Sequence, residues 1–519
     1  MKTTSASSSA FVFAVIFAAI FLLHLPLLRL PYFWDEAGYY IPAARDLLLS
    51  GSVIPLSTPS NAHPPLVMAY LALGWKVAGY SPLVTRTAML LLAAFGLSGV
   101  FRLARRVANQ EVAVAATACT ALYPVFFAQS SMAHVDLAAA GFTIWGLDAY
   151  VAARWRRVAL WFSLAVLAKE TALLAPLALL AWDCACPWAD RFLGAKICLE
   201  ARRWQAVASL LTPAAVLSVW YACHFAKTGN VFGNPEFFRY NVAATLNPLR
   251  IALALGIRLW QAFGYLHLWV LTLLTGWAMT RAPLRDGEIE RPRIDVPVQC
   301  VFGVLVATYV VAMSVIGGAV LARYMLTAVP LVVILGVSTL RRRIRRWPAL
   351  IVLVLAAFTM ALFRNPPYGF APEDNLAYRD YIVMHQDAES FLETHYRGAR
   401  VLTAWPASDE ISHPYLGYVA RPMRVVRIED FTPDEVMGAA QERGRFDVAL
   451  VFSTKYEPAH PLLRWRAWEK LKARFFGFHR DLPPEIVAQL LGGRVRFTER
   501  RSGQWVAVIE LERVYEARR

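Results

Sequence analysis

The chain has 519 residues, of which 57% are hydrophobic and 17% charged, and its mean hydropathy is +0.42. This composition is too apolar and too poor in charge for a soluble protein of this length. The formal net charge of +16 does not indicate nucleic acid as a partner, because the arginine clusters fall between apolar runs rather than on one soluble face. The sequence therefore predicts a membrane protein.

Apolar runs long enough to cross a bilayer, roughly 20 residues each, recur from Phe11 to Arg364 and then stop. Residues 11–30 are predicted to be a retained first helix, because the run is long for a signal peptide and no small-residue cleavage site precedes Pro31. Residues 158–185 fit either one kinked helix or two short ones. We expect about eleven transmembrane helices in a membrane domain over residues 1–364, followed by a second domain over residues 365–519.

Basic residues occur in every second loop, which the positive-inside rule places in the cytoplasm. The clusters are Arg102, Arg105 and Arg106; Arg154, Arg156 and Arg157; and the basic residues within 191–203, 281–293 and 341–346. The protein is therefore predicted to lie in the cell inner (plasma) membrane with its N-terminus in the cytoplasm. The first loop, residues 31–64, and the C-terminal domain are predicted to be extracytoplasmic, as are the loops near residues 129–134, 169–170, 227–250 and 317–322.

The C-terminal domain shows alternating helix and strand patterns. Helices are predicted over 378–395 and 432–444, strands over 399–405, 425–428 and 446–452, and a hairpin over 494–511 that turns at "RSGQ". This pattern indicates a small α/β domain of roughly 140 residues. It contains no G-x-G-x-x-G motif and no evident catalytic constellation.

None of the six cysteines falls in the C-terminal domain, so that domain needs no disulfide. Cys184, Cys186 and Cys198 match no common zinc-site spacing. We expect them to be free thiols on the inner face.

The first external loop begins with "FWDEAGYYIPAARDLLLSG", residues 33–51, which places Asp35 and Glu36 directly after the first span. The part "AARDLLLSG" is amphipathic and predicts a surface helix that ends at Gly51. The turn-rich "IPLSTPSNAHPP" follows. Such a loop is typical of one that forms a site rather than a tether.

Charged residues near the outer ends of spans are informative, because a charge at a helix centre costs roughly 2.5 to 3.5 kcal/mol on insertion scales. The polar residues on that side are Asp35, Glu36, His63, Arg86, His134, Asp136, Lys169, Glu170, Glu236 and Arg323.

Two acidic residues each allow a structural and a functional interpretation. Asp35 is either a helix N-cap, with Glu36 in the first turn, or a general base or cation ligand at the membrane surface. Asp136 opens a span, so it is either a cap that faces water or part of a site.

The basic residues allow the same two interpretations. His63, before the rigid Pro-Pro step, is either a polar turn residue or a site residue. Lys169 and Glu170 form either a self-neutralising pair or part of a site. Arg323 opens a span on the outer side, where it is either an ordinary interfacial arginine or the partner of an anion.

Several segments resemble one known family. The stretches "WDEAGYYIPAARDLLLSG", "HPPL", "VTRTAMLLLA", "LAKETALLAPLALL" and "ARYMLTAVPLVVILG" are similar to the polytopic glycosyltransferases that use polyprenyl-phosphate sugars. These GT-C fold enzymes include the protein O-mannosyltransferases and the lipid A aminoarabinose transferases. The resemblance covers roughly residues 10 to 365.

The resemblance implies roles for individual residues. Asp35, with its neighbour Glu36, matches the acidic residue that acts as base or orients substrate, and Asp136 matches a second acidic residue that helps to hold a divalent cation or the acceptor. Arg323, followed by Tyr324, resembles an arginine that meets the lipid phosphate.

The residues of this side that are expected to bind substrate are His63, Arg86, Lys169, Glu236, Arg323 and Tyr324. His63 departs from the pattern, because aminoarabinose-type relatives commonly have lysine there, and a histidine is only partly charged at neutral pH.

The expected fold is thus a polytopic α-helical, GT-C-like membrane protein with a small extracytoplasmic α/β domain. The expected activity is transfer of a sugar from a polyprenyl-phosphate donor to a protein, lipid or glycan acceptor by a single inverting displacement. A divalent cation at Asp35 and Asp136, but no nucleotide cofactor, is expected.

Two other classes remain open: a transporter or flippase of lipid-linked saccharides, and a non-catalytic relative that binds a partner. The clustering of ionisable residues near one membrane face disfavours the transporter.

Overall fold

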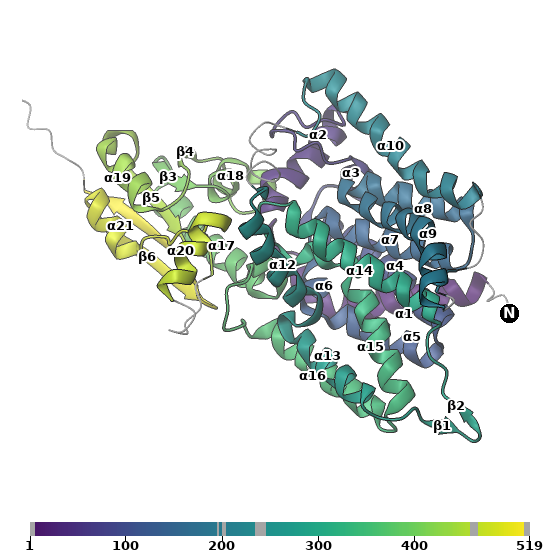
Figure 1. Ribbon diagram of the computed structural model, residues 1–519. Helices are drawn as coiled ribbons and strands as arrows, with labels where there is room; N and C mark the ends of the chain where they lie inside the picture. Colours follow the sequence, from purple (N-terminus) through teal and green to yellow (C-terminus); the bar gives the residue numbers. More distant parts are fainter. Residues whose placement is uncertain (1–5, 195–196, 200–203, 234–244, 457–464, 513–519) are drawn as a thin grey trace, which may run out of the picture. The chain divides into compact units, whose positions relative to one another are not determined.

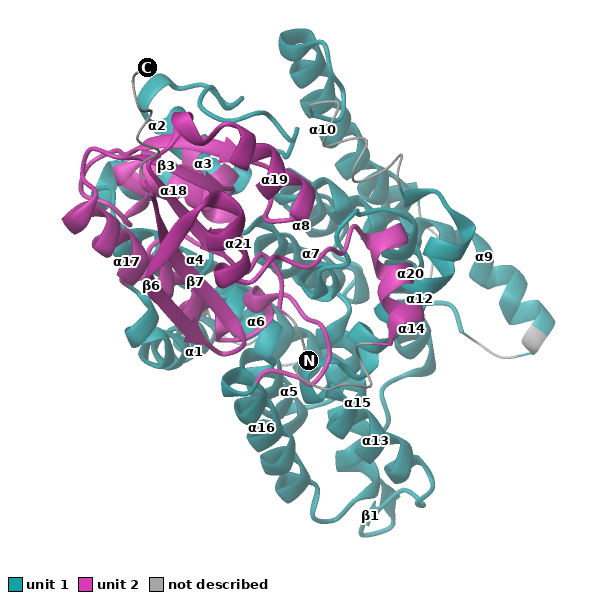
Figure 2. Ribbon diagram, turned by 90° about the vertical axis from the view of Figure 1, so that its left-hand side faces the viewer, with its two compact units in different colours: residues 1–28, 43–364 teal, residues 29–42, 365–519 magenta. Residues whose placement is uncertain are grey.

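The computed structural model describes residues 6–194, 197–199, 204–233, 245–456 and 465–512. It divides into two compact units, coloured separately in Figure 2. Unit 1 comprises residues 1–28 and 43–364, and unit 2 comprises residues 29–42 and 365–519. Residues 29–42, which contain Asp35 and Glu36, therefore group with the C-terminal residues, whereas the sequence analysis assigned the whole first loop to the membrane domain.

Unit 1 is helical (Figure 1). Its helices are α1 (Ala6–His24), α2 (Ile41–Ser50), α3 (Leu66–Ala78), α4 (Pro82–Val107), α5 (Gln110–Leu122), α6 (Pro124–Gln129), α7 (Val135–Val151), α8 (Trp155–Ala168), α9 (Leu174–Leu193), α10 (Trp204–Thr228), α12 (Pro248–Phe263), α13 (Leu268–Met279), α14 (Val296–Val315), α15 (Val329–Arg343) and α16 (Trp347–Phe363). Helix α2 begins in unit 2 and ends directly before Gly51, as predicted. A short hairpin, β1 (Arg285–Asp286) and β2 (Ile289–Glu290), precedes α14.

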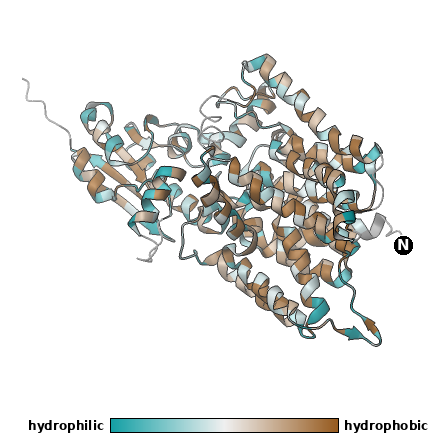
Figure 3. Cartoon of the chain, in the orientation of Figure 1, coloured by the Kyte–Doolittle hydropathy of each residue, from teal (hydrophilic) through white to brown (hydrophobic). Residues whose placement is uncertain are grey.

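Most unit 1 helices are apolar along their length, as Figure 3 shows. Six stretches of the described chain are long and apolar enough to cross a membrane: Ser9–Leu27, Pro82–Val107, Glu170–Phe192, Trp204–Thr228, Pro248–Met279 and Val296–Val315. Two further apolar helices, Leu66–Ala78 and Trp347–Phe363, are shorter. The protein is a multi-pass membrane protein, and the predicted number of about eleven crossings stays a prediction, since six stretches of the described residues meet the length of a span.

Near Lys169, where the sequence allowed either one kinked helix or two short helices, the structure has two helices. Helix α8 ends at Ala168, Lys169 has an extended backbone (φ −154°, ψ 132°), and a 3₁₀ turn, η3 (Glu170–Leu173), leads into α9. Residues 158–185 therefore belong to two helices, α8 and α9, joined by Lys169 and η3.

Helices α4 and α7 are parallel neighbours whose backbones approach closely at two glycines. A Cβ atom on Gly96 would lie 3.2 Å from the Cα atom of Gly141, and one on Gly141 would lie 3.1 Å from the Cα atom of Gly96. Small residues commonly permit such close approach between membrane helices. At one end of this pair Asp148 of α7 bonds Arg102 and Arg106 of α4 at 3.0 and 2.6 Å.

Cys186 and Cys198 form a disulfide with their Cα atoms 5.5 Å apart. The prediction of free thiols was wrong for these two residues. The cause is the chain reversal after α9, where Gly194 adopts a left-handed conformation (φ 59°) and returns the chain toward the helix.

Unit 2 contains a five-stranded sheet in the order β4-β3-β5-β7-β6. Its strands are β3 (Arg400–Ala404), β4 (Arg424–Ile428), β5 (Val448–Phe452), β6 (Gly493–Arg501) and β7 (Gln504–Leu511), and its helices are α17 (Ala377–His395), α18 (Ala407–Ser412), α19 (Pro433–Gln441), α20 (Arg466–Phe476) and α21 (Pro484–Leu491). Strands β3, β4 and β5 are parallel, and β7 is antiparallel to β5 and β6. The α/β prediction is confirmed, including the terminal hairpin, while α18, α20 and α21 were not predicted.

We expect Gly96→Leu to lower the thermal midpoint of the detergent-solubilised protein, because its side chain would meet the backbone of α7; overpacking of this kind costs roughly 1 to 3 kcal/mol. Gly303→Leu in α14 is the matched control, since a Cβ atom there meets nothing within 4 Å. Equal midpoints for the two variants would show that the α4–α7 approach is not tight.

Candidate functional site

Asp136, Lys169 and Arg323 form a buried ion cluster in unit 1. The Nζ atom of Lys169 donates to Oδ1 of Asp136 at 2.6 Å, and Nε of Arg323 lies 3.4 Å from Oδ2 of Asp136. The three side chains are 8%, 3% and 5% exposed for Lys169, Arg323 and Asp136, so the charges depend on one another rather than on water. Asp136 is therefore not a cap that faces water.

The elements that carry this cluster are helix ends and breaks. Asp136 lies in the first turn of α7, Lys169 lies at the break between α8 and η3, and Arg323 lies in the 3₁₀ turn η6 (Ala322–Met325). Each of three elements far apart in sequence thus contributes one charged side chain to the cluster. No periodic pattern in the sequence predicts that these three side chains lie together.

Two cations of this cluster, Lys169 and Arg323, and a third, Arg258, also lie near the ring of Tyr324. The Nζ atom of Lys169 lies 4.2 Å from the ring centroid, and the guanidinium carbons of Arg258 and Arg323 lie 5.3 and 5.9 Å from it. An aromatic face attracts cations and helps to hold them together in a water-poor site. Tyr324, predicted as a substrate-binding residue, therefore lies at the centre of the positive charge.

Two arginines of α12 hold the chain that precedes η6. Arg258 donates from Nε to the carbonyl of Met313 at 3.1 Å and from Nη1 to the carbonyl of Leu321 at 2.7 Å. Arg250 donates from Nη2 to the carbonyls of Gly317 and Gly318 at 2.7 and 3.1 Å. These bonds fix the loop that carries Arg323, and neither arginine was identified from the sequence, because α12 reads as an ordinary amphipathic helix.

His134 and Arg86 extend the cluster. Nη1 of Arg323 lies 3.2 Å from Nδ1 of His134, which also lies 2.7 Å from Oε1 of Gln129. Arg86, 1% exposed, donates from Nη1 to the carbonyl of Ser131 at 3.0 Å. Both residues were candidates from the sequence, and both belong to the same charged region, since Arg86, Lys169 and Arg323 all act electrostatically on His134.

Lys169 and Glu170 do not neutralise each other as a neighbouring pair. Lys169 bonds Asp136, whereas Oε2 of Glu170 lies 2.9 Å from Nδ1 of His63. The extended backbone of Lys169 sends consecutive side chains in different directions, which explains the separate partners. His63 is therefore a partner of a carboxylate in this structure.

The loop that carries His63 is held from two sides. The carboxylate of Asp46 in α2 accepts from the backbone N–H groups of Leu56 and Ser57 at 2.7 Å each. From α10, Nε1 of Trp220 donates to the carbonyl of Ala62 at 2.9 Å. These hydrogen bonds hold the turn-rich segment against α2 and α10.

Asp35 and Glu36 lie in unit 2 at the start of the short helical turn η2 (Glu36–Tyr40). The side chain of Asp35 makes no cap hydrogen bond, so the N-cap interpretation of that side chain is not supported. Glu36, 0% exposed, accepts from the backbone N–H of Phe33 at 2.9 Å and stabilises the turn itself. Glu236 lies outside the described residues.

Comparison with known proteins places the fold. ArnT from Cupriavidus metallidurans, in a crystal structure bound to undecaprenyl phosphate, is similar with a TM-score of 0.52 at 13% identity, over 97% of this chain and 98% of that one. Its structure without ligand gives a TM-score of 0.54 at 12% identity over the same shares. The chain has the GT-C fold.

Two other comparisons match a smaller share of the chain. Residues 62–201 match the family model described as dolichyl-phosphate-mannose-protein mannosyltransferase. An oligosaccharyltransferase from Archaeoglobus fulgidus has a TM-score of 0.44 at 12% identity, over 85% of this chain and 67% of that one. No curated protein sequence matches the chain.

Within the GT-C fold, the set of groups at Asp136 does not fit a divalent cation as the structure has it. Each carboxylate oxygen already faces a basic side chain, Lys169 or Arg323, which would repel a metal ion.

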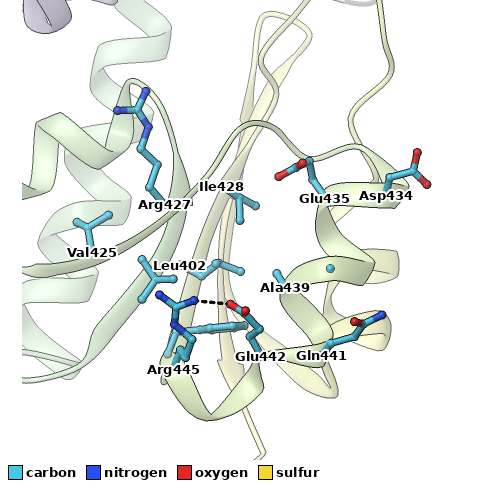
Figure 4. Close-up of a pocket in the computed structure, with 13 residues that line it drawn as sticks. Leu402, Val425, Arg427, Ile428, Asp434, Glu435, Ala439, Gln441, Glu442 and Arg445 are labelled. Atoms are coloured by element: carbon cyan, nitrogen blue, oxygen red, sulfur yellow. Dashed lines mark hydrogen bonds and ion pairs between the residues drawn. The ribbon is translucent and has the colours of Figure 1, made fainter. Parts of the chain in front are cut away.

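A pocket of about 520 Å³ lies elsewhere, in unit 2 between β3, β4 and α19 (Figure 4). Its lining includes Leu402, Ile428 and Glu435, and the ion pair of Arg445 and Glu442 at 2.6 Å. Both charged groups of that pair are largely exposed, and the pocket contains none of the site residues predicted from the sequence.

We expect Asp136→Asn and Lys169→Met each to destabilise the protein, because each leaves a buried partner charge without its counterpart, at a cost of roughly 3 to 5 kcal/mol. The loss of unfolding free energy in the double variant should be smaller than the sum of the losses in the two single variants, by about 0.5 to 3 kcal/mol. Denaturation of the four proteins in one detergent measures this coupling. Additive losses would contradict a direct pair.

Proposed function

We propose that the protein is an integral-membrane glycosyltransferase that moves a sugar from a polyprenyl-phosphate donor to an extracytoplasmic acceptor by one inverting displacement. The observation that carries the proposal is the buried cation cluster around Tyr324 in a chain with the GT-C fold. The undecaprenyl phosphate bound to ArnT and the lipid-phosphate sugar named by the matched family model support the donor class.

In this mechanism the acceptor hydroxyl oxygen attacks the anomeric carbon while the bond from that carbon to the phosphate oxygen breaks. The acceptor proton passes to the Asp35 carboxylate, and the bonding electrons leave with the polyprenyl phosphate. Since one displacement occurs, the configuration at the anomeric carbon inverts.

The basic side chains of unit 1 stabilise the departing phosphate. Lys169 and Arg323 already share one carboxylate, Asp136, which keeps both cations in place when no phosphate is bound. A phosphate oxygen that approaches this cluster meets fixed donors that do not need to reorganise, and such preorganised charge is a main source of rate enhancement. Arg258 adds positive charge while its carbonyl bonds hold it in position.

Asp35→Asn is expected to abolish sugar transfer, because the amide cannot accept the proton of the acceptor. The measurement is transfer from a panel of polyprenyl-phosphate sugars in membranes that contain equal amounts of each protein. Asp387→Asn, which removes a half-exposed carboxylate of α17 in the same unit, is the control and should transfer normally. Full activity of Asp35→Asn would remove Asp35 as the base; lipid-linked saccharide movement without transfer in the wild type would favour a transporter.

Arg323→Gln is expected to raise KM for the donor and to lower kcat, because a hydrogen bond to a charged group contributes roughly 1.5 to 3 kcal/mol, which corresponds to about tenfold to a hundredfold in kcat/KM. Lys76→Gln, at an exposed lysine of α3, is the control for lost positive charge. Unchanged donor kinetics in Arg323→Gln would contradict phosphate binding at this cluster.

A further inference from the structure

Unit 2 contains three buried side chains that combine one imidazole with two carboxylates. His385 and Glu389 are four residues apart on α17, so both side chains lie on the same face of that helix. Glu410 comes from α18. The three residues are 1%, 0% and 0% exposed, and neither the sequence analysis nor the GT-C comparison assigns them a role.

Their polar atoms converge on one point. Nδ1 of His385 lies 2.7 Å from Oε2 of Glu410 and 3.8 Å from Oε1 of Glu389, and one ligand atom from each residue lies within 4.8 Å of the others. Ligand atoms around a tetrahedral ion, each about 2.1 Å from it, are roughly 3.4 Å apart. Small rotations of the two glutamates would therefore enclose one ion.

These atoms have few other partners. Among the residues that the structure describes, both carboxylate oxygens of Glu389, Oε1 of Glu410 and Nε2 of His385 have no hydrogen-bond partner. Burying a carboxylate without donors costs several kcal/mol. Two such carboxylates beside each other require a positive charge or a shared proton.

We propose that His385, Glu389 and Glu410 bind a divalent cation of the zinc class. Imidazole nitrogen and carboxylate oxygen are common zinc ligands, and three protein ligands leave one position for water. Two carboxylates, one neutral imidazole and one Zn²⁺ sum to zero charge, which suits a fully buried site. On binding, Nδ1 of His385 exchanges its hydrogen bond with Glu410 for the ion, the single ring proton resides on Nε2, and a proton shared by the carboxylates is released to solvent.

The proposed metal site links α17 to α18, and residues on or next to these two helices pack against the turn that contains Asp35 and Glu36. Tyr381 lies one turn before His385 on α17. Its ring stacks on the imidazole of His385, with 3.9 Å between the ring centroids, and packs edge-on against the ring of Phe33, with 5.2 Å between the centroids. Trp405 lies two residues before α18, and its ring packs against that of Trp34 with 5.3 Å between the ring centroids. A Cβ atom on Gly38 would lie 2.5 Å from the ring of Trp405, so the backbone of Gly38 is close to that ring.

Asp35 and Glu36 lie within this packed segment, so an ion that ties α17 to α18 also fixes the backbone of Asp35. His385, Glu389 and Glu410 are then positioning residues. This consequence rests on the proposed role of Asp35, whereas the metal site itself does not.

The test uses the full chain, purified in detergent through a tag without histidine. We expect about one equivalent of zinc by elemental analysis, removable by chelator, and a rise of the unfolding midpoint by roughly 5 to 10 °C when Zn²⁺ is returned at a hundred times its Kd. Glu389→Gln and Glu410→Gln should lose the metal and this rise. His395→Ala, at an exposed histidine of the same helix, should keep both.

A wild-type protein that neither retains nor rebinds Zn²⁺ or Mn²⁺, with no midpoint shift, would overturn the proposal and leave a shared proton as the occupant. If the variants fail to fold, the chelation and return of metal to the wild type still decide the matter. Metal bound by a protein that shows no sugar transfer would sustain this site while contradicting the proposed function.

Discussion

The arrangement of unit 1 depends on one buried carboxylate. Lys169 and Arg323 are cations in a region where water is scarce, and Asp136 is the group that compensates both. The extended backbone at Lys169 follows from this requirement, because a continuous helix through residues 168–173 would aim consecutive side chains differently. The break in the helix and the ion cluster are therefore two aspects of one constraint.

In unit 2, the turn that contains Asp35 and Glu36 is held in a defined conformation by its neighbours. Glu36 stabilises the turn by accepting a hydrogen bond from the backbone N–H of Phe33. The aromatic rings of Phe33 and Trp34 bind the turn to α17 and to Trp405. A segment adjacent to the first helix in sequence thus has its conformation determined by residues some 350 to 370 positions later.

Much of the secondary structure could be predicted because its signals are local. The hairpin over β6 and β7 has alternating residues and a Ser-Gly turn, and α17 has a clear helical period. The partners within the sites could not be predicted, because Asp136 and Lys169, separated by 33 residues, carry no sign of their pairing. The spacing of His385 and Glu389 was visible as a shared helical face, but Glu410 lies in a six-residue helix too short for a periodic signal.

Under the proposed function, the charges of the unit 1 cluster favour a phosphate that gains negative charge during the reaction. Lys169, Arg258, Arg323 and Arg86 stand against two carboxylates, Asp136 and Glu170, and Glu170 is engaged with His63. A sugar linked to a polyprenyl phosphate carries one negative charge on its phosphodiester, and the departing monoester carries close to two at neutral pH. A site with excess positive charge therefore binds the leaving group more tightly than the donor, and the difference appears in the transition state, where it lowers the barrier. In the proposed mechanism, fixed lysine and arginine side chains supply the stabilisation that many phosphate-transferring sites obtain from a metal ion.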